Sequence, residues 1–175
     1  MIKKIYAPLT KKCITSLKAG DEVLLDGVIY TARDLAHQEL TKAIRQKKRL
    51  PFLLRNQVIY YCGPNPPLEK RAIGSCGPTT SSRMDPFTVD LLKRGLKGMI
   101  GKGRRNPEVR RAIKKYKAVY FLTIAGAGAL LSTRVRKASV FAYKGFGPEA
   151  IYKLEVEDFP LIVAIDSQGR DVFKK

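Results

Sequence analysis

The sequence has 175 residues, of which 45% are hydrophobic and 28% charged, a composition typical of a globular domain with its own core. It carries 34 Lys and Arg against 15 Asp and Glu, which gives a formal net charge of +19. The longest uncharged stretch, residues 118–133, is shorter than the roughly 20 apolar residues that a membrane span needs. The first residues lack the apolar segment of a signal peptide, so we expect a cytoplasmic protein.

The positive charge predicts an anionic partner. Self-repulsion at this charge disfavours an isolated compact chain. Nucleic acid, an acidic membrane surface or an acidic protein subunit would relieve the repulsion, and an anionic small substrate would also be attracted. Composition alone leaves these four possibilities open.

The cysteines give no sign of a metal site within the chain. Cys13, Cys62 and Cys76 are widely spaced, and the sequence has one histidine. An odd number of cysteines without a signal peptide argues against a disulfide framework. Because zinc and iron–sulfur spacings are missing, we interpret each cysteine as a small buried thiol.

Strand and helix patterns alternate along the chain. Strands are expected at residues 23–30 (or a short hairpin around Asp26-Gly27), 58–62, 72–76, 97–100, 118–124, 138–143, 151–156 and 161–165. Helices are expected at about 33–47, from Pro86 with Asp85 as N-cap to Gly95, from Asn106 to Lys117, and at 126–133. The alternation predicts one α/β domain over residues 1–175, with the outer strands forming a second sheet.

A first candidate site lies at the start of the helix expected near residue 33. Arg33 and His37 are four residues apart and therefore share one helical face. A guanidinium grips a carboxylate through two N–H groups, and an imidazole transfers a proton near neutral pH. The alternative is a solvated arginine and a histidine bonded to the backbone.

The second candidate is the segment 77–85, which reads Gly-Pro-Thr-Thr-Ser-Ser-Arg-Met-Asp. Four hydroxyls and Arg83 precede a helix N-terminus, where backbone N–H groups favour an anion. Thr79 and Thr80 can add hydroxyl donors to such a site. The alternative is that the segment only caps the helix.

The third candidate is Gly101-Lys102-Gly103, which ends an expected strand. The two glycines let the backbone approach a ligand closely, although the spacing is not that of a P-loop. A tight turn with a solvated lysine is the alternative. We interpret the basic run that follows, residues 104–117, as a solvated face or one facing an acidic subunit, because its tyrosines form no stacking ladder.

Together these segments supply three cations, Arg33, Arg83 and Lys102, beside His37 and Thr79 or Thr80. This set suits a ligand with two carboxylates and a reaction that moves a proton next to one of them. Reasoning from the residues alone ends at an anion site for a polycarboxylate.

The same segments resemble the β subunit of two-subunit class I fumarate hydratases and L-tartrate dehydratases, and equally the C-terminal domain of single-chain class I fumarases. The matching pieces are residues 33–37, 77–85, 100–103 and 156–166. They run in family order across nearly the whole chain, and the nine-residue segment 77–85 is the most specific.

The resemblance implies a swivelling three-layer β/β/α domain, with a central, mostly parallel sheet and a second, smaller antiparallel sheet. It implies reversible hydration of fumarate to malate or, alternatively, dehydration of tartrate to oxaloacetate. It also implies a 4Fe–4S cluster held by a separate α subunit in an α2β2 heterotetramer, with one iron acting as a Lewis acid. No cofactor would then be bound by this chain alone.

By position, the resemblance assigns substrate binding to Arg33, Thr80, Arg83 and Lys102, and catalysis to His37 and Thr79. Thr79 would lie at the proton-bearing carbon, and its hydroxyl would need an activator from the α subunit. His37 would be an acid/base or an orienting group. A remote alternative is a non-enzymatic basic module that binds nucleic acid with strong salt dependence.

Overall fold

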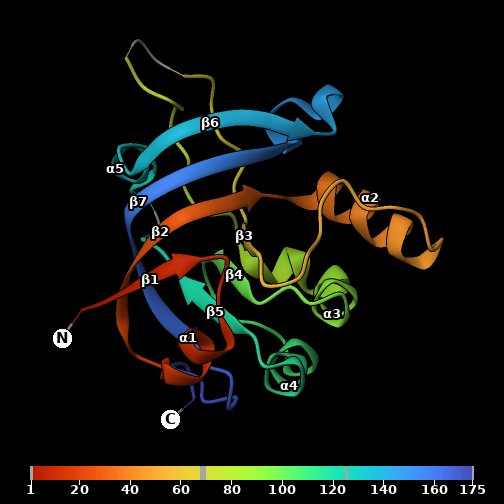
Figure 1. Ribbon diagram of the computed structural model, residues 1–175, viewed down its shortest axis with the longest axis vertical. Helices are drawn as coiled ribbons and strands as arrows, with labels where there is room; N and C mark the ends of the chain where they lie inside the picture. Colours follow the sequence, from red (N-terminus) through yellow and green to blue (C-terminus); the bar gives the residue numbers. More distant parts are fainter. Residues whose placement is uncertain (1, 68–69, 125, 175) are drawn as a thin grey trace.

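The computed structural model describes residues 2–67, 70–124 and 126–174, which form a mixed sheet with helices packed on it (Figure 1). The strands are β1 (Lys3–Ala7), β2 (Glu22–Thr31), β3 (Val58–Tyr60), β4 (Gly98–Gly101), β5 (Val119–Leu122), β6 (Val135–Ala142) and β7 (Ile151–Ile165). The helices are α1 (Lys11–Ser16), α2 (Asp34–Arg45), α3 (Asp85–Lys93), α4 (Pro107–Tyr116) and α5 (Gly128–Ser132), with 3₁₀ turns η1 (Ser81–Met84) and η2 (Lys144–Glu149). None of the helices in these ranges has the length and apolar character needed to cross a membrane.

The strands are ordered β1-β2-β3-β4-β5-β7-β6, and β2 also pairs with β7. Strands β1 to β5 pair in parallel, whereas β7 is antiparallel to β2, β5 and β6. The predicted α/β class, with parallel and antiparallel groups of strands, is confirmed. The two groups share the long strands β2 and β7, so their hydrogen bonding is continuous.

Two hydrophobic cores lie on opposite sides of the parallel strands. Successive strand residues point to opposite faces, so Val58 and Tyr60 pack with β1, β2 and β7, while Ile59 and Met99 pack against the helices. In Figure 1, α2, α3 and α4 lie on one side of β3 to β5, and β6 and β7 lie on the other. The layers are therefore helices, parallel strands and antiparallel strands.

Several local predictions were wrong. Residues 72–76 form no strand, because the loop uses other partners: the Cys76 N–H donates to the Gly128 carbonyl, and the Tyr60 hydroxyl donates to the Cys76 carbonyl. The segments 151–156 and 161–165 are one strand, β7, which continues through a bulge. At the bulge, Asp158 has a φ of 49° and donates its N–H to the Asp26 carboxylate. Strand β2 continues through Asp26, so the hairpin considered around Asp26-Gly27 does not form. Strand β1 and helix α1 were not predicted.

Candidate functional site

The carboxyl ends of the adjacent strands β2, β3, β4 and β5 lie along one edge of the sheet, because these strands are parallel. Arg33 comes two residues after β2, and Lys102 directly follows β4. Such an edge is where open α/β sheets bind ligands. The sheet topology thus places the first and third candidate segments at the same edge.

The second candidate segment crosses this edge between β3 and β4. The Thr79 N–H donates to the Tyr61 carbonyl over 2.7 Å, and the Ser81 N–H donates to the Lys102 carbonyl over 3.0 Å. Gly101 makes this approach possible, since a Cβ there would lie 1.9 Å from the Ser81 hydroxyl oxygen. Residues 79–83 are therefore held against the strand ends, and all three candidate segments meet.

Two of the three predicted cations at this edge already face a carboxylate of the chain. Arg83 donates to both oxygens of Asp34, with Nε–Oδ1 at 3.2 Å and Nη2–Oδ2 at 2.6 Å. Arg33 Nη2 lies 3.6 Å from Glu149 Oε1, and the buried Nε of Arg33 has no hydrogen-bond partner among the described residues. Lys102 makes no ion pair with any carboxylate in the ranges that the structure describes.

The three cations thus differ in how much charge is left for a ligand. Arg33 keeps several N–H groups free, because a 3.6 Å contact is longer than a hydrogen bond. Lys102 keeps its full charge, whereas Arg83 must share its donors with Asp34. The exposed fractions of the Arg83 and Asp34 side chains are 49% and 24%, so this ion pair contributes at most about 1 kcal/mol to stability.

His37 lies inside the protein, beneath Arg33. Its side chain is fully buried, and its ring packs at 5.3 Å from the Tyr61 ring and 6.0 Å from the Phe87 ring. Nδ1 lies 2.8 Å from the Arg33 carbonyl oxygen, which can only accept, so Nδ1 carries the proton. Burial is the main cause that lowers the pKa of His37 to about 4; the hydrogen bond to Arg33 opposes this shift, and the nearby Arg105 adds to it. The imidazole is therefore neutral near pH 7 and bonded to the backbone.

The two threonines lie on the surface of the edge. Thr79 is half-buried and Thr80 is exposed, and Thr80 forms a parallel bridge with Lys102. Their position beside Lys102 and Arg83 agrees with a role in contacting a bound anion. The roles of the six predicted residues remain predictions.

A buried polar network supports the edge from below. The Arg105 side chain, which is inaccessible to solvent, donates to Asp85 over 2.6 Å, to Thr88 over 2.7 Å and to the Tyr61 hydroxyl over 3.2 Å. Tyr120 Oη lies 2.8 Å from the Gly103 carbonyl, to which it donates, and 2.9 Å from Ser81 Oγ. The network therefore connects the starts of α3 and α4 to both segments of the edge.

This network corrects two predictions. Asp85 does not cap α3 but is its first residue, and its carboxylate accepts from Arg105 and from the Asn106 N–H. Arg105 is not part of a solvated face, because it is buried between the rings of Tyr61 and Tyr120. The one sequence signal was Asp85 itself, a carboxylate at the end of an otherwise cationic motif, which requires a cation once it is buried.

Comparison with known proteins agrees with this arrangement. A family model described as Fumarase C-terminus matches residues 2–175. The chain belongs to the fumarase C-terminus family.

Relatives of this family are found both as short chains and as long ones. A Methanocaldococcus jannaschii protein, provisionally named L(+)-tartrate dehydratase subunit beta, is 38% identical over 97% of this chain and 90% of its own length. The class I anaerobic fumarate hydratase of Escherichia coli is 36% identical over 99% of this chain but 31% of its own length. Fumarate hydratase 2 of Leishmania major is 35% identical over 93% of this chain and 29% of its own length. The chain thus spans nearly all of the first relative and less than a third of the other two.

The cysteines of this fumarase C-terminus domain do not fit a four-iron cluster. Cys62 and Cys76 are buried side by side, and the contact with the Cys76 thiol, together with burial, raises the pKa of Cys62 well above its usual value. Cys13 belongs to α1. Within the described ranges, no group of three or more His, Cys, Asp or Glu side chains converges in a way that could hold a metal ion.

Proposed function

We propose that this chain is the β subunit of a class I hydro-lyase that hydrates fumarate reversibly to malate. The observation that carries the proposal is the meeting of Arg33, Arg83 and Lys102 with Thr79 and Thr80 at one edge of the sheet. A four-carbon dicarboxylate has two anionic ends, and three cations around one open edge can hold both. The fumarate hydratases among the relatives support this choice of substrate.

In this proposal the cations do more than bind. Removal of a proton next to a carboxylate spreads negative charge onto that carboxylate. Fixed cations at that position stabilise the transition state more than the ground state, typically by about 3–4 kcal/mol for each donor that is lost on mutation. Arg33 and Lys102 are the strongest candidates, because Arg33 has a donor without a partner and Lys102 has no described counter-ion.

Thr79 is proposed to contact the carbon that loses the proton. Its main chain is fixed by the hydrogen bond to Tyr61, so its hydroxyl has a defined position at the edge. A hydroxyl is a weak base by itself, and the activating group is expected from a partner subunit. Thr80, one residue further along, is proposed to bind a substrate carboxylate beside Lys102.

His37 is proposed to position Arg33 and not to transfer a proton to the substrate. A ring that is fully buried and neutral near pH 7 does not reach a ligand on the surface. Its Nδ1–H fixes the carbonyl of Arg33, the residue at the N-terminal boundary of α2. Of the two roles expected for His37, orientation is therefore the one that we propose.

The 4Fe–4S cluster is proposed to belong to a partner α subunit, since the thiols of this chain do not fit it. A relative that bears the name of a beta subunit and matches this chain in length supports a two-subunit enzyme. We propose an α2β2 assembly in the cytoplasm. The edge that carries the six residues is the face that the α subunit would complete.

Reconstitution tests the proposal directly. The chain is purified alone and together with an iron–sulfur α subunit, and turnover is measured with malate, fumarate and tartrate. The proposal expects no iron and no hydratase activity in the isolated chain, and malate–fumarate turnover in the pair. A brown isolated chain with about four irons, or a pair without hydro-lyase activity, would overturn it.

Tartrate dehydration is the second candidate, because a relative that this chain matches over 90% of the relative's own length is named for it. Malate and tartrate differ by one hydroxyl, so both fit the same three cations. The ratio of kcat/KM for tartrate and malate in the reconstituted pair decides between them.

A further inference from the structure

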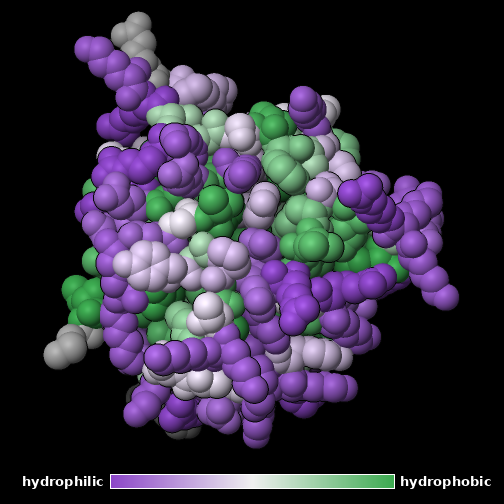
Figure 2. All heavy atoms as spheres, viewed as in Figure 1, coloured by the Kyte–Doolittle hydropathy of each residue, from purple (hydrophilic) through white to green (hydrophobic). Residues whose placement is uncertain are grey.

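The opposite edge of the parallel sheet carries a basic groove with no assigned role. A groove of about 860 Å³ lies at the amino ends of β3, β4 and β5, where α3 and α4 end. Seven cations line it: Lys11, Arg55, Lys93, Arg94, Lys97, Lys115 and Lys117. Lys93 lies 3.8 Å from Asp90 on α3, whereas among the described residues no carboxylate pairs with the other six, and no Asp or Glu lines the groove. Hydrophilic side chains gather over the lower part of Figure 2, where Figure 1 shows α1 and α4.

Helix dipoles do not account for this charge. Cations are favourable at helix C-termini, and both α3 and α4 end here. Each C-terminus contributes roughly half a negative charge, so the two together balance only about one of the seven cations. The remaining charge is concentrated in a concave site, which strengthens the local positive potential.

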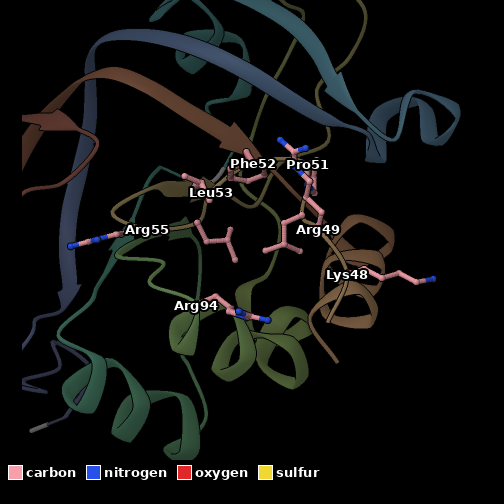
Figure 3. A pocket seen from close by; sticks show the side chains of 9 residues that line it. Lys48, Arg49, Pro51, Phe52, Leu53, Arg55 and Arg94 are labelled. Atoms are coloured by element: carbon pink, nitrogen blue, oxygen red, sulfur yellow. The ribbon is translucent and has the colours of Figure 1, made fainter. Parts of the chain in front are cut away.

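Backbone contacts join the two segments that carry the arginines of the groove, whose side chains extend in different directions in Figure 3. The Asn56 N–H donates to the Gly95 carbonyl over 2.9 Å, which joins the segment that carries Arg55 to the end of α3, where Arg94 lies. Gly95 has a φ of 94°, and a Cβ on it would come within 3.1 Å of the Arg55 Cα. Figure 3 shows Arg94 at the end of α3 and Arg55 extending away from Arg49 and Phe52.

Lys97 lies deeper than the other cations. It is half-buried, its ammonium group donates to the Tyr116 carbonyl at the end of α4, and burial lowers its pKa. Lys117 donates in a similar way to the Ser167 carbonyl over 3.4 Å. Lys97 therefore stays fixed at the wall of the groove, while Lys11, Lys115 and Lys117 are exposed at its rim.

We propose that this groove binds a small ligand with a chain of phosphates. Its volume lies within the range of about 300–1,000 Å³ that is usual for small-molecule sites. Arginine forks match phosphate oxygens in pairs, and the six cations without a described carboxylate partner exceed what a single phosphate can contact. A nucleic-acid duplex is convex and would contact the exposed cations of the rim but not the half-buried Lys97.

Isothermal titration calorimetry of the full chain at fixed ionic strength tests this proposal. The probe is inorganic tripolyphosphate, compared with orthophosphate, ATP, a penta-glutamate peptide and a short DNA duplex. We expect one tripolyphosphate per chain, bound at least about tenfold more tightly than orthophosphate. If ATP binds as tightly as tripolyphosphate, the phosphate chain is sufficient for binding. If ATP binds more tightly, its nucleoside makes a further contact, for which Tyr116 is the candidate. Both outcomes support the site.

Paired variants decide whether the groove or the net charge binds. Arg55→Gln/Arg94→Gln is expected to weaken tripolyphosphate binding about tenfold or more, because two charge-assisted contacts are lost. Lys144→Gln/Lys153→Gln removes the same charge at the β6–β7 end and is expected to change binding by less than about twofold. If the arginine variant does not fold, Lys11→Gln/Lys115→Gln at the rim replaces it. Equal losses in both pairs, or tighter binding of the peptide or the duplex than of tripolyphosphate, would overturn the proposal.

Discussion

The two ends of the parallel strands carry positive charge in opposite ways. At the carboxyl edge the cations are few, and two of them are oriented by carboxylates: Arg83 by Asp34 and Arg33 by Glu149. At the amino edge seven cations share one groove with no carboxylate among the described lining residues, and only Lys93 of the seven lies near a described carboxylate, that of Asp90. The number of charges is therefore a poor guide to a catalytic site, whereas charges fixed by neighbouring groups indicate preorganisation for chemistry.

The difference extends below the surface. The carboxyl edge is supported by the buried Arg105 network, and its segments are in van der Waals contact at Gly101. At the amino edge most cationic side chains are exposed and free to adapt to a ligand. We therefore expect substitutions at the carboxyl edge to affect turnover strongly and those at the amino edge to affect only anion binding.

The largest effect is expected for Gly101→Ala. The new Cβ would lie 1.9 Å from Ser81 Oγ, so residues 79–83 must move away from the strand ends. We expect turnover of the assembled enzyme to fall about 100-fold or more, with a loss of roughly 1–3 kcal/mol in the free energy of unfolding. Steady-state kinetics and denaturant unfolding measure both.

Gly145→Ala is the matched control, since a Cβ at Gly145 meets nothing within 4 Å and its φ is not positive. It should leave both quantities unchanged. Normal turnover in Gly101→Ala would mean that the close contact at this edge is not required for the reaction.

The second largest effect is expected for Arg83→Lys. Lysine keeps the charge but cannot bind Asp34 and a substrate carboxylate through a planar fork. We expect kcat/KM to fall roughly 30- to 1,000-fold, which corresponds to about 2–4 kcal/mol of transition-state stabilisation. Arg111→Lys, an exposed arginine on α4, serves as the control. A change of less than about threefold in Arg83→Lys would favour a purely structural role for Arg83.

His37 distinguishes positioning from proton transfer through its pH dependence. Its pKa in the folded chain, about 4, lies below the ordinary 6.5, so the unfolded chain takes up the proton first as the pH falls. The stability that this group contributes is complete above pH 6.5, and about 3 kcal/mol of it is lost by pH 4. Denaturant unfolding at several pH values should show this decline in the wild type and a smaller one in His37→Asn.

The activity profile gives a second test of His37. Because His37 is the one histidine of the chain, any imidazole limb contributed by this subunit must come from it. As a positioning residue, it should leave no limb near pH 6.5 in kcat. A limb that disappears in His37→Asn would restore proton transfer as its role.

Much of the edge was predictable because two of the three motifs closely follow a strand. Arg33 and Lys102 follow β2 and β4, and the carboxyl ends of parallel strands meet at one edge. The pairing of Arg83 with Asp34 and the burial of Arg105 were not predictable, since both depend on contacts between residues far apart in the sequence. A basic run has the same composition whether it is solvated or holds one buried arginine.

The strand pattern shows the same division. The strands buried on both faces, such as β5, were recognised from their apolar residues. β1 was missed because it is a short strand of mixed burial, stabilised by its parallel pairing with β2. Pairing of this kind lies in the tertiary structure and not in the local sequence.

The smallest effect is expected for Tyr120→Phe, which removes one hydroxyl and keeps the ring beside Arg105. Burial raises the pKa of Tyr120 well above its usual value, so the hydroxyl remains a donor at any working pH. Its loss leaves the Gly103 carbonyl without that donor and frees Ser81, whose oxygen accepts the Lys102 N–H over 3.1 Å. Because the Ser81 hydroxyl holds the main chain of Lys102, its displacement should raise KM for the dicarboxylate and lower kcat. We expect kcat/KM to fall about three- to tenfold.

Tyr30→Phe, which removes a hydroxyl without a hydrogen-bond partner among the described residues, is expected to match the wild type. If Tyr120→Phe lowers only the melting temperature and leaves kcat/KM unchanged, the main-chain bond between Ser81 and Lys102 is enough to hold the lysine in place.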